Sequence, residues 1–346
     1  MTAQRDAEVV DTDADDADDA EGTQEPENAP GSVAGKSPTQ IALQRLRADK
    51  VAVVCSVILG VLVLLAALGP IIVRVFDIYP TISFPGAPSQ SEVLDQFGFP
   101  LTGPPYYGFT WAHPLGIEPA SGADNLASIL YGLKTSLIVA TSATVLSTLI
   151  GVAIGLMAGF SRGWLDRVLS FLIDLFLSFP FLLGALTLAP IITSRFSDDL
   201  DALNRAQLFG VIGVLVVFGW MTVARLIRGQ VLSLREREFV QSAQVIGVPT
   251  SRILFKELLP NMVAPIVVAT SLMMPAYVAA EAGLAYLGIG ITGQPSLGRT
   301  ILAASKYYDS YPLYLWVPVG VVAVLVLALN LLGDSVRDAF DPRTRR

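Results

Sequence analysis

The residue types that usually carry enzyme chemistry are scarce in this chain of 346 residues. His113 is its single histidine and Cys55 its single cysteine. A histidine without a His or Cys partner is poorly suited to a metal site, so we expect His113 to make a structural hydrogen bond. Cys55 cannot form a disulfide within the chain. The sequence therefore predicts neither an enzyme nor a metal site.

One stretch comes close to a nucleotide-binding motif. Residues 31–37 read GSVAGKS, but the spacing from the first Gly to the Gly-Lys pair is one residue short of a phosphate-binding loop, and no strand precedes it. We expect no cofactor on this chain. A membrane protein that needs energy must then borrow it from a partner or use an ion gradient.

Two carboxylates lie in or beside strongly apolar stretches, Asp174 and Glu281. A carboxylate inside a membrane span costs about 2.5 to 3.5 kcal/mol on insertion scales, so Asp174 should face protein or water and pair with Arg225 or Arg228. Both a structural ion pair and a transported-ion site are open for Asp174. Glu281 either lines an outer path or anchors a helix end. We keep both carboxylates as candidate path or gating residues.

Membrane-spanning helices must position these residues. The chain is 53% hydrophobic and only 15% charged, with a mean hydropathy of +0.58, which excludes an ordinary soluble domain. A helix rises about 1.5 Å per residue and the hydrocarbon core is about 30 Å thick, so roughly 20 apolar residues cross it. We expect an all-α polytopic protein with six transmembrane helices in a lipid bilayer. They cover residues 51–73, 136–160, 168–192, 208–224, 262–280 and 313–332.

Small residues and prolines mark special positions in these spans. Gly151, Gly155 and Gly159 recur every four residues in the second span, a spacing that lets another helix approach closely. We assign them to helix packing. Prolines predict kinks in the last two spans. These are Pro265, Pro275 and Pro318, and the third span also contains Pro180.

Lys and Arg are unevenly divided between the two sides that these spans create. With the first residues inside and the distant tail left out, sixteen lie on the inner side and six on the outer side. An excess of basic residues marks the cytoplasmic side. We therefore expect both termini in the cytoplasm and residues 74–135 outside. The six outer residues are Arg74, Lys134, Arg195, Arg205, Arg299 and Lys306.

The two ends of the chain have different character from the spans. Residues 1–36 are rich in Asp and Glu and lack apolar periodicity, so we expect a disordered tail. Residues 37–50 fit a cytoplasmic amphipathic helix that starts at Ser37 and lies on the membrane surface, although a plain basic flank is equally consistent. Residues 333–346 form the expected cytoplasmic C-terminal tail.

A charged stretch, residues 233–261, separates the fourth and fifth spans. Ser233 followed by Glu236 has the spacing of a capping box and predicts the start of a short helix there. Residues 247–249, Gly-Val-Pro, should break that helix. A second short helix should follow over residues 250–260. Two short helices joined by a Gly turn form a protrusion suited to docking on another protein.

This stretch resembles the EAA loop of ABC importer permeases, in which Glu-Ala-Ala is followed four residues later by Gly and then by a Leu-Pro ending. The chain keeps the third position and the Gly, and it departs at the first two. The resemblance implies contact with a cytoplasmic ATPase. The candidate residues for that contact are Glu238, Gln241, Ser242, Ala243, Gly247, Val248, Pro249, Leu259 and Pro260.

Three further runs resemble the C-type subunit of oligopeptide and dipeptide uptake systems: HPLG from His113, AEAGLAYLGIG around Glu281, and NLLGDSVRDAFDPR from Asn330. The resemblance implies a type I ABC importer-like permease in the inner (plasma) membrane. It also implies a second homologous permease, two cytoplasmic ATPases that hold ATP and Mg, and an extracytoplasmic substrate-binding protein. No nucleic acid is expected. The substrate stays open between oligopeptides, dipeptides, nickel chelates and other solutes.

Two other classes of protein compete with this interpretation. An ion-coupled secondary transporter would need internal repeats and functional charges within its spans, and no repeat is visible in the sequence. A membrane scaffold would not need a docking loop of two helices.

Overall fold

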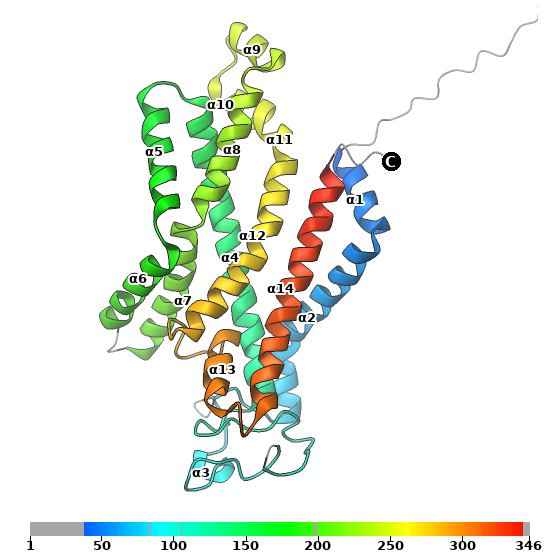
Figure 1. Ribbon diagram of the computed structural model, residues 1–346, viewed down its shortest axis with the longest axis vertical. Coiled ribbons are helices and arrows are strands. Elements are labelled where there is room, and N and C mark those ends of the chain that lie inside the picture. The colour runs from blue at the N-terminus through cyan, green and yellow to red at the C-terminus, as the bar shows by residue number, and fades with distance from the viewer. Residues whose placement is uncertain (1–37, 82–83, 105, 197–198, 342–346) are drawn as a thin grey trace, which may run out of the picture. The chain divides into compact units, whose positions relative to one another are not determined.

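The computed structural model describes residues 38–341, with gaps at 82–83, 105 and 197–198. The described part is built from helices joined by loops (Figure 1). The acidic tail expected over residues 1–36, the helix start expected at Ser37 and the last residues from 342 lie outside the described residues.

The first two helices are α1 (Pro38–Ala48) and α2 (Lys50–Phe76). Asp49 separates them and caps α2, because its side chain accepts a hydrogen bond from the Val51 N–H. The helix expected over residues 37–50 is present as α1, but it also packs on protein. Arg45 Nη1 donates to the Asp341 carbonyl at 3.0 Å, at the end of the last helix, α14 (Pro312–Phe340).

The central helix is α4 (Asn125–Phe160), which starts eleven residues before the expected span. The early start follows from Asp124, whose side chain accepts hydrogen bonds from the Leu126 and Ala127 N–H groups. Between α2 and α4, the segment 77–124 contains only the short helix α3 (Gln90–Val93) among its described residues.

The expected close packing of the glycine stripe is confirmed. α4 lies against α8 (Trp220–Leu234), and a β-carbon added to any of the three glycines would clash with it. At Gly151 the added carbon would lie 2.6 Å from the Trp220 carbonyl oxygen, and at Gly159 2.6 Å from Val231 Cβ. Only glycine permits this separation of the two helices.

The expected third span is not one straight helix. It consists of α5 (Trp164–Ser178) and α6 (Phe181–Arg195), which are bent by 82° at a break formed by Phe179 and Pro180. Proline lacks the N–H that would continue the helix. Phe218 packs in this bend: its ring stacks on Phe179 with centroids 5.5 Å apart and meets Phe181 edge-on at 6.2 Å.

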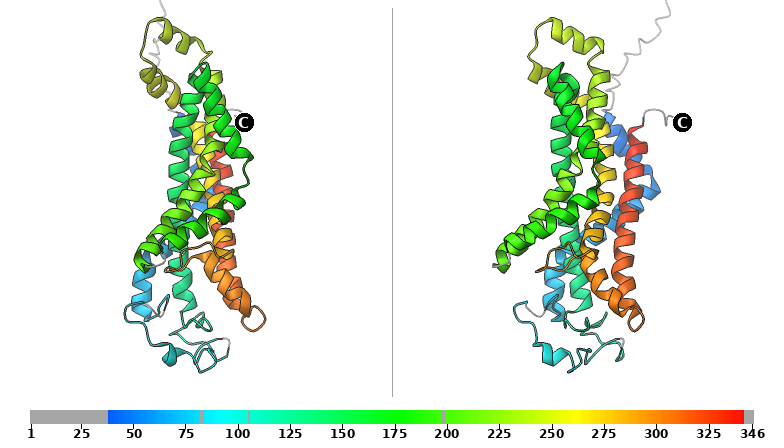
Figure 2. Two further views of the ribbon diagram at one scale, coloured as in Figure 1. Left: turned by 90° about the vertical axis from the view of Figure 1, so that its left-hand side faces the viewer. Right: turned by 60° about the vertical axis from the view of Figure 1, so that its left-hand side comes forward.

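The fourth span is longer than expected, because α7 (Leu200–Val217) and α8 form one apolar stretch from Asp201 to Leu234. α6 and the start of α7 diverge from the other long helices (Figure 2). Within the described residues, five helices are long and apolar enough to cross a membrane, or six if the bent pair α5–α6 counts as one span.

The remaining helices are α12 (Val263–Tyr286), α13 (Leu297–Ala304), a short turn η2 (Ser305–Tyr307) and α14. α12 and α14 continue through Pro275 and Pro318. The sequence did not predict α13, which lies against α12 and α4. The main core lies where α4, α7, α12 and α14 meet, around Val139, Leu215, Val278 and Leu325.

Candidate functional site

The stretch expected to dock on a partner lies at the opposite end of the helices from segment 77–124 (Figure 1). It contains α9 (Glu238–Val245), α10 (Thr250–Arg252), the π-helix η1 (Ile253–Leu258) and α11 (Leu259–Asn261). We call residues 235–262 the cytoplasmic loop after the side predicted for it from the distribution of Lys and Arg, and that side stays a prediction.

The helix start predicted at Ser233 is wrong. Ser233 lies in the last turn of α8, and α9 begins at Glu238 after Arg237. α8 continues past the capping signal because its apolar face stays buried as far as Val231. Burial of that face outweighs the local preference for a cap.

The predicted glycine turn is present at Gly247. Its φ of 83° is a left-handed conformation that a side chain disfavours. The Gly247 N–H donates to the Gln244 carbonyl at 3.1 Å, and the Val248 N–H donates to the Ala243 carbonyl at 3.0 Å. These bonds close the end of α9 in the way that helix C-terminal turns usually do.

The second helix of the loop begins at Thr250, as predicted, but it does not end at Leu259-Pro260. The helical path runs through η1 and α11 and changes direction only at Met262, where φ is −105°. Pro260 is tolerated because it stands in the first turn of α11. The loop is therefore joined to α12 without an intervening coil.

The base of the cytoplasmic loop is fixed by buried apolar side chains, while its tip is exposed. Val240, Ile253 and Leu258 are fully buried and pack with Val231 of α8. At the tip, Val245 is 88% exposed and Ile246 is 79% exposed. We call these two side chains the apolar tip. A rigid base that presents exposed apolar side chains fits a protein-docking element.

The sequence interpretation missed the apolar tip, although two β-branched residues directly before a turn glycine were a usable signal. Its predicted contact residues surround the tip. Of these, Glu238, Gln241, Ser242, Gly247, Pro249 and Pro260 are exposed, and Ala243, Val248 and Leu259 are half-buried.

The predicted ion pair of Asp174 is present, and its partner is Arg225. Arg225 Nη2 of α8 lies 2.5 Å from Asp174 Oδ1 of α5. Arg228, about one turn further along α8, instead binds Asp166, about two turns earlier in α5, at 2.9 Å. α5 and α8 are thus connected by two ion pairs.

Glu281 lies inside α12, five residues before the helix ends, rather than at its end. Its side chain is buried, and Ser136 Oγ of α4 donates to Glu281 Oε2 at 2.6 Å. Gly132 lies beside this contact, and a β-carbon there would be 3.0 Å from the Leu297 N at the start of α13. This buried position inside α12 differs from the helix-end anchor that the sequence offered as one of two alternatives. Its role in a path stays a prediction.

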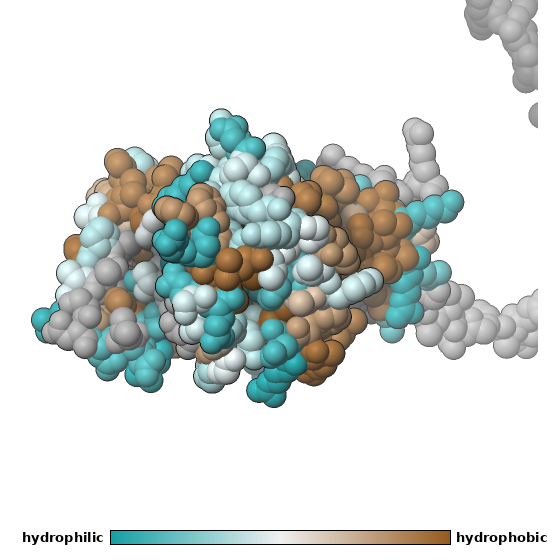
Figure 3. Space-filling model, turned by 90° about the horizontal axis from the view of Figure 1, so that it is seen from below, coloured by the Kyte–Doolittle hydropathy of each residue, from teal (hydrophilic) through white to brown (hydrophobic). Residues whose placement is uncertain are grey.

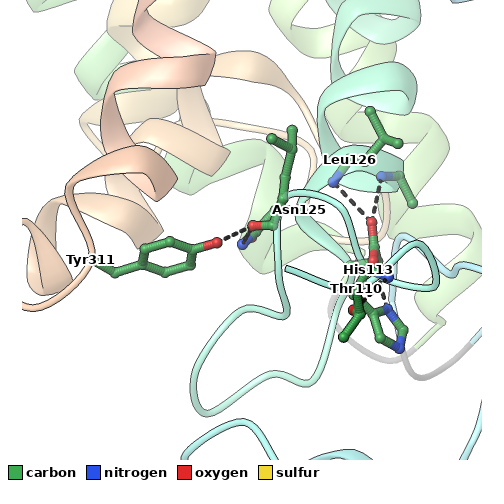
Figure 4. A network of polar contacts seen from close by, with 8 residues as sticks. Thr110, His113, Asn125, Leu126 and Tyr311 are labelled. Carbon is green, nitrogen blue, oxygen red and sulfur yellow. Dashed lines mark hydrogen bonds and ion pairs between the residues drawn. The ribbon is translucent and has the colours of Figure 1, made fainter. Parts of the chain in front are cut away.

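The expected hydrogen bond of His113 is present at the far end of the molecule. His113 Nδ1 lies 2.9 Å from Asp124 Oδ2, the same side chain that caps α4 (Figure 4). Nearby, Asn125 Nδ2 and the Tyr311 hydroxyl both donate to the Leu115 carbonyl. The histidine therefore helps to hold segment 77–124 against α4.

Segment 77–124 also contains a perturbed carboxyl group. Burial raises the pKa of the Glu118 carboxyl above its usual range, although the nearby Arg299 of α13 works against this.

Within the described residues no group of three His, Cys, Asp or Glu side chains is placed to hold a metal ion. Seen from this end, hydrophobic patches lie among hydrophilic residues (Figure 3).

Two sequence families match parts of the chain. Residues 151–346 match the family described as "Binding-protein-dependent transport system inner membrane component". Residues 37–87 match the "N-terminal TM domain of oligopeptide transport permease C".

Individual relatives extend these matches. "Oligopeptide transport system permease protein OppC" of Bacillus subtilis (strain 168) is 30% identical over 309 residues, which are 88% of this chain and 90% of the relative. The protein of the same name from Mycobacterium tuberculosis is 35% identical over 236 residues, 67% of this chain and 77% of the relative. Among solved structures, "Inward facing conformations of the MetNI methionine ABC transporter" matches with a TM-score of 0.50 at 19% identity, covering 62% of this chain and 96% of that one. That structure supports the fold alone.

Proposed function

Because the chain belongs to the family of binding-protein-dependent transport system inner membrane components, we propose that it is the permease subunit of an ATP-driven importer of oligopeptides or dipeptides. Relatives of high coverage carry the name of oligopeptide permeases, which supports this substrate class. The proposed setting is the inner membrane. The proposed partners are a second homologous permease, two cytoplasmic ATPases that bind ATP and Mg, and an external substrate-binding protein.

The apolar tip carries the mechanistic part of this proposal. It stands on a loop whose base is buried, and α8 leads directly into that loop. The proposed role of the tip is to occupy a groove on an ATPase, where burial of Val245 and Ile246 stabilises the contact by about 1.5 to 3 kcal/mol per side chain.

Movement of the docked loop would reach the spans through α8. α8 packs on α4 along the glycine stripe, and two ion pairs connect it to α5. Closure of two ATPases on ATP would push two such loops together. The spans would then rock between inward-facing and outward-facing arrangements as packed units.

The test is reconstitution of the full complex in vesicles, with a labelled peptide and the binding protein outside. Uptake should require ATP and both ATPases. Uptake that persists on an ion gradient without the ATPases would contradict the proposal and favour a secondary transporter.

The docking role has its own test. Ile246→Asp should release the ATPases from the purified complex and abolish peptide-stimulated ATP hydrolysis, because a charge cannot enter an apolar groove. Phe97→Asp is the matched control, since Phe97 is similarly exposed at the opposite end of the molecule. Equal ATPase retention in both variants would contradict the docking role of the tip.

A further inference from the structure

The Asp174–Arg225 ion pair is exposed at a depth where most of the chain is apolar. The two side chains are 63% and 61% exposed. Asp174 lies ten residues from the start of α5, and Arg225 lies nine residues before the end of α8. At about 1.5 Å per residue, each is roughly 15 Å from the cytoplasmic end of its helix. The α7–α8 stretch of 34 residues is about 51 Å long, more than a hydrocarbon core about 30 Å thick, so the end of α8 extends beyond the core and the pair lies in the part of the core nearer that end.

Contact with lipid would destabilise this pair of charged side chains. A charged side chain at the centre of a spanning helix costs about 2.5 to 3.5 kcal/mol, so such residues face water or protein. The exposed side chains of α2, such as Val57 and Ile71, are apolar and suit lipid. α4 lies between α2 and α5 (Figure 1). The pair therefore needs water or a protein partner beside this face of α5 and α8, and a water-filled path would supply the water.

The pair keeps unused hydrogen-bonding capacity. Among the described residues, Arg225 contacts Asp174 through Nη2 alone, although a guanidinium has five N–H donors and a carboxylate two acceptor oxygens. The neighbouring pair differs: Arg228 donates to Asp166 from both Nε and Nη2, Ser170 adds a third bond at 3.0 Å, and the pair is only about 30% exposed. Asp166–Arg228 therefore connects two helices with most of its hydrogen bonds made within the protein, whereas Asp174–Arg225 has donors and acceptors left for a ligand.

We propose that Asp174 and Arg225 are a contact site for the charged ends of a peptide during its passage. The ligand must offer both signs of charge. A peptide with free ends does so, because its α-ammonium group can bind the Asp174 carboxylate and its α-carboxylate can bind the planar Arg225 guanidinium through two N–H groups. This assignment rests on the proposed peptide transport, which it deepens by naming what the path recognises.

The experiment uses the complete importer in vesicles and three forms of one short peptide: free, N-acetylated and C-amidated. The measurement is the transport rate of each blocked form relative to the free form with the same binding protein, so that selection by the binding protein cancels between variants. The unmodified complex should favour the free peptide. Asp174→Asn should remove the preference against the N-acetylated form, and Arg225→Gln that against the C-amidated form, each by about tenfold. Asp166→Asn is the matched control and should leave both ratios unchanged.

The outcomes separate the two levels of the proposal. If the unmodified complex transports no form of the peptide, the proposed function fails and the contact site fails with it. If it transports peptides without discriminating between the forms, or if both ratios are unchanged in Asp174→Asn and Arg225→Gln, only the contact site is overturned.

A second measurement holds where a charge variant fails to assemble. Thr222 is exposed on α8 one turn from Arg225. In a Cys55→Ala background, Thr222→Cys should react with a water-soluble thiol reagent, whereas Val57→Cys on α2 should not. An unreactive Thr222→Cys, with and without ATP, would overturn the water-filled path at this face.

Discussion

Replacing Gly155 by valine should separate α4 from α8. A β-carbon at this position would lie 2.7 Å from the Ala224 carbonyl oxygen and 2.7 Å from Ile227 Cβ, and neither is the end of a flexible side chain. Ordinary contact begins at 3.4 Å, so the two helices must move apart by about 0.7 Å before the rest of the valine side chain is accommodated.

Overpacking of this kind costs about 1 to 3 kcal/mol. A loss of about 2 kcal/mol changes the unfolding equilibrium constant by roughly 30-fold. The assay is unfolding of the purified chain in mixed micelles by increasing fractions of denaturing detergent, followed by circular dichroism. Gly155→Val should unfold at a distinctly lower fraction than the unmodified chain.

Gly213→Val is the matched control, because a β-carbon at Gly213 of α7 would have no atom within 4 Å. It introduces the same side chain into a helix of similar character. If both variants unfold together with the unmodified chain, the contact between α4 and α8 is looser than the glycine stripe indicates, and the argument from close packing is refuted.

Three further outcomes are expected. Gly247→Val should leave the chain in the membrane but weaken ATPase retention, since a β-branched residue at a φ of 83° costs about 1 to 2 kcal/mol in the turn; unchanged peptide-stimulated ATP hydrolysis would show that the turn is not part of the contact. For orientation, a cysteine at Ser89 should be labelled from outside and one at Thr250 only from inside, and the reverse pattern would invert the topology. Burial raises the pKa of Glu118, so the native state holds that proton more tightly than the unfolded chain. Its contribution to stability is therefore fully present below the ordinary glutamate pKa and is lost as pH rises through the raised value. Glu118→Gln should remove this part of the pH dependence of unfolding, and an unchanged profile would contradict the assignment.

Elements governed by local chemistry were predictable from the sequence. The turn at Gly247 and the close packing at Gly155 follow from residue types and spacing, and both are present. Pro180 was a usable signal for the bend between α5 and α6, which the sequence interpretation did not predict, and proline alone does not give its size of 82°. That angle depends on side chains distant in sequence, such as Phe218.

Elements governed by tertiary burial were not predictable. The capping signal at Ser233 failed because α8 gains more from packing on α4 than from ending early. α13 was not predicted because its eight residues are too few to span a membrane. Its helical structure is stabilised by packing against α12 and α4, which the sequence does not show. For the Asp174–Arg225 pair, the sequence predicted that Asp174 has an arginine partner, because a carboxylate in an apolar run needs one. It did not predict which partner, because Arg225 and Arg228 were equally suitable and only the packing of α5 on α8 selects Arg225.

The ring of Phe218 fills the inside of the bend between α5 and α6. It touches aromatic rings on both sides of the bend, Phe179 and Phe181, and it occupies the space that a side chain at position 184 would need. α5 is connected by two ion pairs to α8, and hence to the cytoplasmic loop, whereas α6 packs on α7. We expect a rotation of α5 at this bend to displace the far end of α6. The size of the side chain at position 218 should therefore affect how a movement of the loop reaches α6.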